Sequence, residues 1–244
     1  MWYERDYFIH YYDIDLNKKA SISSLLRYFE DIAILHSEYV KRGIDYYSEH
    51  HVGWVLYKWD IKISRYPEFK EIIKVRTKPS YLKSFQAYRY FDILDSVGNR
   101  IVTANSMWLF LNTDTKKPTR ITEDIFEGYG VDKNKMTELE FGDINMLSKI
   151  NSERKFDIRH IDIDSNHHVN NIKYVEWALE MVPQNIVNNY IIDNLKVNYK
   201  KETAYGKSII SSIDMLEKEK SIKCTHQISS EESILCLLET NWQL

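Results

Sequence analysis

The sequence predicts an α+β protein built from two tandem repeats, in each of which an antiparallel sheet wraps around one long helix. The first observation behind this prediction is an internal repeat that relates the two ends of the chain. The second is the order of elements, because each copy reads as a strand, a helical stretch and then about four strands. The third is that only 7 of the 244 residues are Gly and 4 are Pro, which favours long regular elements over loops.

The internal repeat is found by sliding the chain along itself. At a shift of 149 residues, seven of fourteen consecutive positions are identical without a gap. A shift of 134 residues aligns the later part of each copy and places Glu68 on Glu202. The two shifts differ by 15 residues, so the first copy should hold a longer helix or an extra element around residues 39–53. The identical pairs are Glu4 with Glu153, Arg5 with Arg154, Ile9 with Ile158, Asp13 with Asp162, Ile14 with Ile163, Asp15 with Asp164, and Asn17 with Asn166.

The first copy shows both helical and strand periodicity. Apolar residues recur on one face from Ile22 to Leu35, which predicts a helix beginning near Ser21. Residues 38–51 should extend or follow this helix, and residues 95–99 have the composition of a hairpin turn. Strands are expected at residues 3–12, 52–64, 72–79, 84–94 and 100–112.

The helix of the second copy follows a polar loop. Apolar residues at helical spacing run from Ile172 to Val182, and Pro183 is expected to end the helix. Asn170 and Asn171 stand just before this run, where a side-chain oxygen can accept hydrogen bonds from the first N–H groups of a helix.

These patterns divide the chain into a first repeat at residues 1–115, a connector at 116–149 and a second repeat at 150–244. The connector is polar and long for a loop, so it should hold a short helix near Asp124 or cross a surface. The order of strand, long helix and antiparallel strands is that of the hot-dog fold. A tandem pair of such repeats would form a double hot-dog.

The composition excludes several classes of protein. A net charge of −3 argues against nonspecific nucleic-acid binding. No stretch approaches the roughly 18 apolar residues of a membrane helix, and the first residues do not form a signal region, so we expect a cytoplasmic protein without membrane insertion. Cys224 and Cys236 lack the spacing of a metal or redox motif and should lie buried on strands. His167 and His168 are adjacent and should point apart, so no metal site is expected.

The loop before the second helix carries groups capable of chemistry. Asp164, Asn166 and His168 fall within five residues and lead directly into the helix N-terminus. The first N–H groups of a helix can stabilise an oxyanion, so we expect the backbone amides of Val169 and Asn170 to do so. In the first copy Lys19 replaces the histidine, and a lysine is not a neutral base near pH 7 without a large pKa shift. The second copy is therefore expected to be catalytic and the first to be scaffold. The alternative is that the aspartate and asparagine only cap the helix.

Three segments resemble the acyl-acyl-carrier-protein thioesterases in their bacterial form. The first is Asp-Ser-Asn-His-His-Val-Asn-Asn at residues 164–171, followed by a Tyr and a Trp. The second is Tyr-Lys-Lys-Glu at residues 199–202, and the third is Trp-Leu-Phe-Leu-Asn at 108–112 with Lys117, Pro118 and Arg120. The resemblance covers nearly the whole chain. It implies a double hot-dog fold, hydrolysis of fatty acyl thioesters with release of the free acid, an acyl carrier protein as partner and no cofactor.

The catalytic set implied by this resemblance maps to Asp164, Asn166, His168 and Glu202. Asp164 would act as nucleophile or as general base toward water, and the sequence leaves this choice open. Glu202 would hold the working tautomer of His168 or share the base role, unless it is an ordinary exposed strand residue. Plant members carry a cysteine where this chain has Thr203, so a cysteine nucleophile is not needed here.

Substrate-binding residues are less well marked. Tyr174 and Trp177 are interpreted as core packing. The first repeat is expected to bind the acyl chain, with Trp54, Trp59 and Trp108 as candidates for its lining, although most aromatic residues should be core. An acidic carrier protein would need a local basic patch, unless these residues are ordinary solvated surface. The candidates for this patch are Lys116, Lys117, Arg120, Lys200 and Lys201.

Three other functions remain as alternatives. A thioesterase acting on acyl-CoA would share the same site, and a non-catalytic acyl-binding protein would share the fold. A dehydratase of this fold is disfavoured, because the His-Phe-Pro-Gly type of motif is absent from the sequence. The preferred chain length and the formation of a homodimer are left open.

Overall fold

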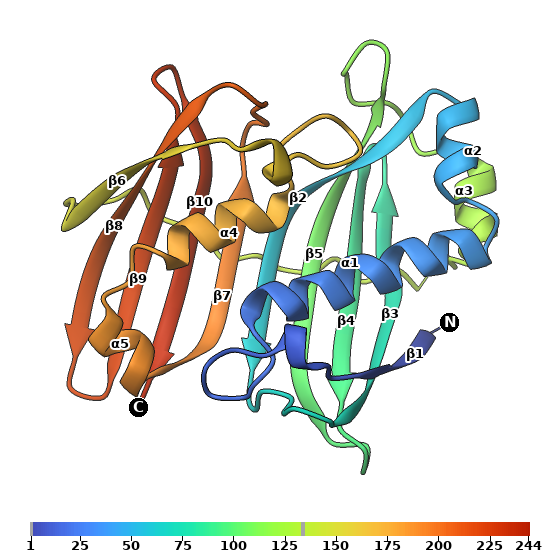
Figure 1. The fold of residues 1–244 in the computed structure, drawn as a ribbon. Coiled ribbons are helices and arrows are strands. Elements are labelled where there is room, and N and C mark those ends of the chain that lie inside the picture. Colours follow the sequence, from blue (N-terminus) through green and yellow to red (C-terminus); the bar gives the residue numbers. More distant parts are fainter. Residues whose placement is uncertain (1, 133–134) are drawn as a thin grey trace. The chain divides into compact units, whose positions relative to one another are not determined.

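The computed structural model describes residues 2–132 and 135–244. By its internal contacts the chain forms two compact units. The first comprises Met1–Tyr57 and Ile63–Phe141, and the second comprises Lys58–Lys62 and Gly142–Leu244. The α+β fold expected from the sequence, with antiparallel strands packed against helices, is confirmed in both units (Figure 1).

The first unit is a sheet with one long helix across one face (Figure 1). Its strands are paired in the order β1-β3-β4-β5-β2. The helix α1, Ile22–Tyr39, begins where the Ser21 side chain accepts a hydrogen bond from the amide of Ser24 at 3.1 Å. Its apolar face, which includes Phe29, is buried against the sheet. The strands are β1 (Tyr3–Phe8), β2 (Val52–Ile63), β3 (Ile72–Lys83), β4 (Gln86–Leu94) and β5 (Arg100–Asn112).

Two short helices accompany this sheet. The extra element expected in the first copy is α2, Ile44–Glu49, and the helix expected in the connector is α3, Glu123–Gly128. Residues of α3 and of the strand ends form a small apolar cluster there. Its buried members are Leu82, Phe110, Ile121, Ile125 and Tyr129.

Two strand boundaries differ from the prediction by four residues. The first strand stops at Phe8, because the chain then turns into a short 3-10 helix, Tyr11–Asp13. β3 continues past Pro79, which lacks an N–H for the ladder, and the pairing with β4 shifts register between Pro79 and Tyr81.

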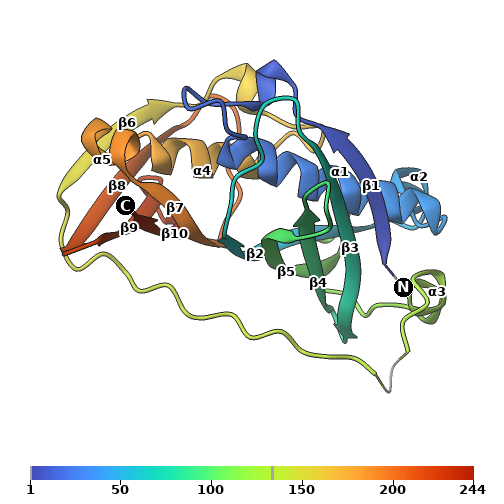
Figure 2. The same ribbon diagram turned by 90° about the horizontal axis from the view of Figure 1, so that it is seen from below.

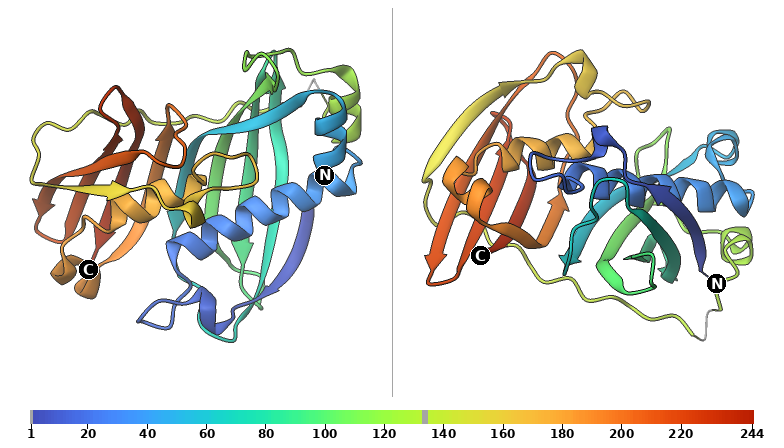
Figure 3. Two further views of the ribbon diagram at one scale, coloured as in Figure 1. Left: turned by 45° about the horizontal axis from the view of Figure 1, so that its top comes forward. Right: turned by 60° about the horizontal axis from the view of Figure 1, so that its bottom comes forward.

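The second unit repeats the arrangement with a shorter helix (Figure 3). Its strands are paired in the order β7-β10-β9-β8-β6, all antiparallel, and Lys58–Lys62 of β2 pair with β7. Cys224 and Cys236 lie buried and unbridged on β9 and β10, as expected. The strands are β6 (Ser152–Asp157), β7 (Ile191–Tyr199), β8 (Ser208–Lys218), β9 (Ser221–Ser229) and β10 (Ile234–Gln243).

The helix α4, Asn171–Leu179, packs on the sheet of the second unit. The predicted cap is confirmed, because the Asn170 side chain accepts a hydrogen bond from the amide of Ile172 at 2.9 Å. The helix ends before Pro183, which caps a further short helix, α5, Gln184–Asn189. The last part of the connector crosses the opposite face of this sheet (Figure 2), where Ser148 donates to Asp214 at 2.6 Å. Among the described residues, no helix is both long enough and apolar enough to span a bilayer.

Candidate active site

The polar loop before α4 begins with a short 3-10 helix, His160–Asp162, that fixes its direction. The carboxylate of Asp162 is buried and accepts hydrogen bonds from the backbone N–H of Arg159 at 2.8 Å and from its guanidinium at 2.8 Å. Burial alone would raise the pKa of Asp162, but the hydrogen bonds and the charge of Arg159 hold this pKa below its ordinary value. The start of the loop is therefore a structural ion pair.

The centre of the loop is a tight turn built on Asp164. Its Oδ1 accepts hydrogen bonds from the amides of Asn166 at 2.8 Å and His168 at 3.4 Å. The amide of Asp164 in turn donates to the carbonyl of His168 at 2.8 Å, and His167 takes a φ of 63° to close the turn. Among the described residues none donates a hydrogen bond to Oδ2, so this oxygen is the one available for chemistry.

A second segment, after β7, meets this loop. The amide of Val169 donates to the carbonyl of Thr203 at 2.9 Å. This backbone bond places Glu202 beside His168, and Nε2 of the imidazole lies 3.2 Å from Oε1 of the carboxylate. The His168 side chain is 28% exposed and that of Glu202 is 56% exposed, so the pair can be reached by substrate.

The four residues of the expected catalytic set thus lie on two adjoining segments of the second unit. Asp164, Asn166 and His168 belong to one turn, and Glu202 comes from the neighbouring segment. The side chain of Asn166 is exposed, and its amide group makes no hydrogen bond with the described residues. The arrangement offers a carboxylate, an imidazole oriented by a second carboxylate, and a neutral donor.

The expected oxyanion donors are not available in this structure. The amide of Val169 is used by Thr203, and the amide of Asn170 donates to the carbonyl of Asp162 at 2.9 Å. Both N–H groups therefore hold the loop in place in this structure, and their expected role toward an oxyanion stays a prediction. The sequence identifies the start of the helix, but it does not reveal the acceptors that the fold brings to it.

The three tryptophans expected to line an acyl site lie in different surroundings. Trp54 is half-buried, donates to the hydroxyl of Tyr47 at 2.8 Å and packs on Phe110. Trp59 is buried in the core on the part of β2 that belongs to the second unit. Trp108 is half-buried and donates to Ser106 at 2.7 Å. Trp54 and Trp108 belong to the first unit and Trp59 to the second.

The expected basic residues fall into two groups. Lys116 and Lys117 are exposed in the turn after β5, and Arg120 lines a cavity of about 500 Å³ beside α3. Lys200 and Lys201 are exposed directly before Glu202 and make no ion pair with the described residues. The second group therefore adjoins the His168–Glu202 pair.

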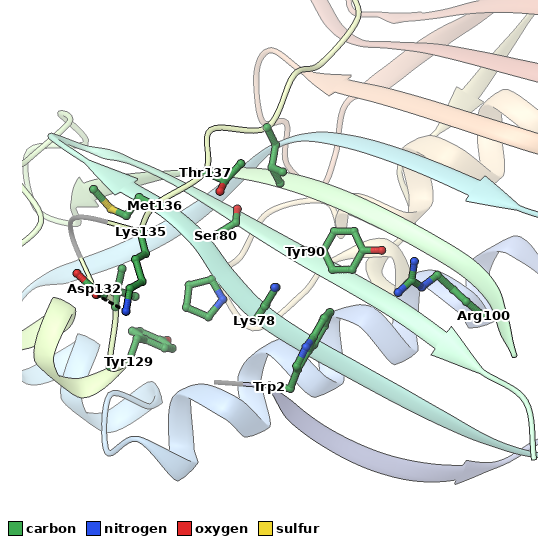
Figure 4. Close-up of a pocket in the computed structure, with 14 residues that line it drawn as sticks. Trp2, Lys78, Ser80, Tyr90, Arg100, Tyr129, Asp132, Lys135, Met136 and Thr137 are labelled. Carbon is green, nitrogen blue, oxygen red and sulfur yellow. Dashed lines mark ion pairs between the residues drawn. The ribbon is translucent and has the colours of Figure 1, made fainter. Parts of the chain in front are cut away.

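The first unit has another cavity, of about 510 Å³, between its sheet and the connector (Figure 4). Trp2, Lys78, Tyr90 and Arg100 line it from the sheet side, and Tyr129 lies on the connector side. The Lys78 ammonium lies 4.7 Å from the centre of the Trp2 ring. None of the residues expected to act in catalysis or acyl binding lines this cavity.

Comparison with known protein families matches two models in succession. The model of the acyl-ACP thioesterase N-terminal domain matches residues 1–129, and that of the C-terminal domain matches residues 146–244. These two matches cover most of the chain.

Curated relatives are plant enzymes of greater length. The oleoyl-acyl carrier protein thioesterase of Coriandrum sativum is 23% identical over 93% of this chain and 66% of its own length. Oleoyl-acyl carrier protein thioesterase 2 of Arabidopsis thaliana is 25% identical over 82% of this chain and 59% of its own. The chain therefore spans about three fifths to two thirds of the length of these relatives.

Solved structures show the same fold at low identity. A putative oleoyl thioesterase from Lactobacillus plantarum superposes with a TM-score of 0.93 at 22% identity, covering 100% of this chain and 96% of that one. An acyl-ACP thioesterase from Bacteroides thetaiotaomicron gives a TM-score of 0.86 at 21% identity, covering 99% and 98%. With the matching family models, these likenesses confirm the double hot-dog fold expected from the sequence.

Proposed function

Because the chain belongs to the acyl-ACP thioesterase family, we propose that it hydrolyses fatty acyl thioesters of acyl carrier protein and so ends fatty-acid elongation. The observation that carries this proposal is the contact of 3.2 Å between His168 and Glu202 beside the turn of Asp164. Thioester hydrolysis needs a nucleophile or an activated water, and these groups can supply either.

The contact with Glu202 assigns the tautomer of His168. A carboxylate accepts hydrogen bonds, so the proton of the neutral imidazole belongs on Nε2, which faces Oε1 at 3.2 Å. Nδ1 then carries the lone pair and can accept a proton during the reaction. Glu202 is the positioning residue in this scheme, and His168 is the group that meets the substrate.

Asp164 has two routes to the same products, and both use Oδ2. As general base it takes a proton from water while the water oxygen bonds to the thioester carbon. As nucleophile it bonds to that carbon itself, and water then hydrolyses the resulting anhydride. In either route the carbon–sulfur bond breaks, the fatty acid takes the oxygen of water, and the thiolate of the carrier takes a proton.

The developing oxyanion needs donors other than the amides of Val169 and Asn170, which are engaged. The side-chain amide of Asn166 is exposed on the same turn as Asp164, and we assign this role to it. This assignment uses Asn166 Nδ2 and leaves its backbone N–H in the turn.

We assign the acyl chain to the first repeat and carrier docking to basic residues beside the site. Lys200 and Lys201 are the strongest candidates, because they are unpaired among the described residues and directly precede Glu202. Lys116, Lys117 and Arg120 are the second candidate patch. Trp54, Trp59 and Trp108 remain candidates for contact with the acyl chain.

The proposal is tested with a ladder of acyl chains presented on carrier protein and, in parallel, on CoA. We expect free fatty acid from the carrier-bound thioesters at a higher kcat/KM than from matched CoA thioesters. A higher kcat/KM for every CoA thioester would make the protein an acyl-CoA thioesterase. Binding of acyl chains without release of acid from either series would make it a non-catalytic acyl-binding protein.

A further inference from the structure

The cavity of about 510 Å³ in the first unit lies on the face of the sheet opposite to α1. Lys78 of β3 and Tyr90 of β4 stand opposite each other in the strand register, and both line the cavity (Figure 4). Thr77 and Phe91 come next to them on the same two strands and are buried on the other face. There the rings of Phe91 and Phe29 of α1 pack with their centres 5.1 Å apart. The cavity therefore belongs to the outer face of this sheet.

The connector closes the cavity at the edge of β3. β1 pairs with β3 as far as Thr77, and the connector follows further along the same edge, where the amide of Thr137 donates to the carbonyl of Ser80 at 2.8 Å. The walls thus come from the sheet, from Trp2 before β1 and from the connector, all within the first unit. The volume falls within the range of about 300–1,000 Å³ that is usual for sites of small organic ligands.

Several side chains that line this cavity are hydrogen-bond donors without an acceptor. The side chain of Lys78 makes no hydrogen bond or ion pair with the described residues, and its ammonium lies over the Trp2 ring. The hydroxyl of Tyr90 and the terminal NH₂ groups of Arg100 also make no hydrogen bond with the described residues. The hydroxyl of Ser80 is buried and has no partner among them either. Unpaired donors at one cavity point to a ligand that supplies acceptors.

The charges at the cavity favour an anionic ligand. Three cationic residues line it together with a single carboxylate, and this carboxylate, Asp132, already lies 3.2 Å from Lys135. Arg100 shares the buried carboxylate of Asp92 with Arg76, and their hydrogen bonds to its Oδ2 are 3.2 Å and 3.0 Å long. Two guanidinium groups thus divide one negative charge.

The acidic residues of the neighbouring strand do not neutralise Lys78. The carboxylates of Glu4 and Asp6 in β1 lie 2.9 Å and 3.8 Å from the ammonium of Lys74, which is four residues earlier in β3. One positive charge of Lys78 and one of the guanidinium pair are therefore left without a carboxylate among the described residues. This excess is local, because the whole chain has a net charge of −3.

We propose that the cavity binds a phosphate monoester whose organic part is aromatic, such as a nucleoside monophosphate. Such a phosphate carries close to two negative charges near pH 7, which match the two unpaired positive charges. Phosphate oxygens accept hydrogen bonds from ammonium and guanidinium groups, and the hydroxyls of Ser80 and Tyr90 add neutral donors. The rings of Trp2 and Tyr90, 5.5 Å apart at their centres, and of Tyr129 provide aromatic surface for the organic part.

This inference does not rest on the proposed function, since no residue of the candidate catalytic set lines the cavity. The test is calorimetric titration of the protein, without any thioester, with AMP, adenosine, inorganic phosphate and dodecanoate. We expect AMP to bind at least about tenfold more tightly than adenosine or inorganic phosphate, because each of these offers only one part of the contacts. Dodecanoate, with a single charge and no ring, should bind more weakly than AMP.

Two variants locate the site, and one serves as control. Lys78→Gln should weaken AMP binding about tenfold, the scale of a hydrogen bond to a charged group. Ser80→Ala should weaken it about fivefold, the scale of a neutral hydrogen bond, and should not lower the thermal midpoint, because a buried hydroxyl without a partner is removed. The matched control is Lys74→Gln, which removes the same charge from the same strand at a residue that does not line the cavity. Its AMP affinity should be close to the original at physiological ionic strength.

Thermal midpoints near the original in these variants would show that a lost affinity does not reflect unfolding. The proposal would be overturned if AMP fails to saturate the protein at millimolar concentration, or if adenosine or dodecanoate binds as tightly as AMP. Equal losses in Lys74→Gln and Lys78→Gln would also overturn it, because they would reflect the general field of the surface rather than a site.

Discussion

The loops at residues 10–21 and 159–170 have nearly the same backbone and different chemistry. In each, an aspartate, Asp15 or Asp164, accepts a hydrogen bond at Oδ1 from the amide two residues later at 2.8 Å. In each, the amide of that aspartate donates to the carbonyl four residues later, also at 2.8 Å. The turn alone therefore accounts for the Asp of the motif in both repeats, whereas it uses only the backbone N–H of the Asn.

The two loops differ in one side chain and in the contact that this side chain makes. His168 lies against Glu202 in the second repeat, whereas Lys19 occupies the corresponding position in the first. Glu68, the counterpart of Glu202, pairs with Lys19 only through an isolated backbone bridge. Both repeats therefore contain the same turn. Only the turn of the second repeat has a histidine with an acidic partner, and this pair makes it the candidate active site.

The largest effect is expected when the second loop is converted into the first. His168→Lys removes the neutral imidazole and retains a side chain that this backbone accommodates at Lys19. We expect kcat to fall about a thousandfold, within the range for loss of a general acid or base, while the thermal midpoint changes little. Lys19→Ala in the first loop is the control and should leave kcat near the original. A kcat for His168→Lys within a few-fold of the original would show that the two loops do not differ in the way proposed.

Stability, in contrast to activity, should depend on both repeats. His36 in α1 and His226 in β9 are buried, and burial lowers the pKa of each to about 3, with the charge of Arg89 adding to the effect at His36. The unfolded chain binds a proton at each histidine below about pH 6.5, and the folded chain does not until about pH 3. The free energy of unfolding should therefore decrease as pH falls through this window, by up to about 1.4 kcal/mol per pH unit for each histidine.

Urea unfolding between pH 7 and pH 4 measures this dependence. His36→Gln and His226→Gln should each reduce the slope of the free energy of unfolding against pH by the amount due to one proton. Each variant will also be less stable at pH 7. The carboxylates are the same in all three proteins and form a common background. Parallel curves for the variants and the original protein would mean that these histidines titrate normally in the folded state.

Carrier docking should give a smaller effect, confined to one kind of substrate. Lys200→Glu with Lys201→Glu should raise KM for carrier-bound thioesters about tenfold, because an acidic partner is repelled at the entrance. Small thioester analogues should be hydrolysed as before. Changing Lys116, Lys117 and Arg120 to Glu tests the second candidate patch in the same way. Added salt should reduce the difference in KM between the original protein and the variant, because charges are screened over about 8 Å at physiological ionic strength. Equal losses on both kinds of substrate would remove the docking role.

Much of this fold is predictable from the sequence because its signals are local. The periodicity of α1, the cap at Asn170 and the repeat shift of 149 residues lead to two similar sheets with one helix each. The candidate catalytic set was implied by the family resemblance, and the alignment of the two copies added only that they differ at the histidine.

The features that the sequence does not show depend on partners that are distant in the chain. The amide of Val169 is engaged by Thr203, and the sequence does not show that the segment after β7 lies against the loop. The prediction that Tyr174 packs in the core is confirmed, because the residue is 2% exposed. Its helical spacing does not reveal that the hydroxyl has no hydrogen-bond partner among the described residues. The register shift that carries β3 past Pro79 likewise depends on its neighbour β4.

The central claim is that one of two equivalent aspartates performs the chemistry. Asn caps a turn about as well as Asp, so Asp164→Asn and Asp15→Asn should each preserve the fold and shift the thermal midpoint little. Side-by-side measurement of kcat and thermal midpoint decides the matter. We predict that turnover collapses by about a thousandfold or more in Asp164→Asn, with acyl binding retained, and stays near the original in Asp15→Asn. Equal and mild losses of activity in both variants would contradict the account and return Asp164 to the role of a turn residue.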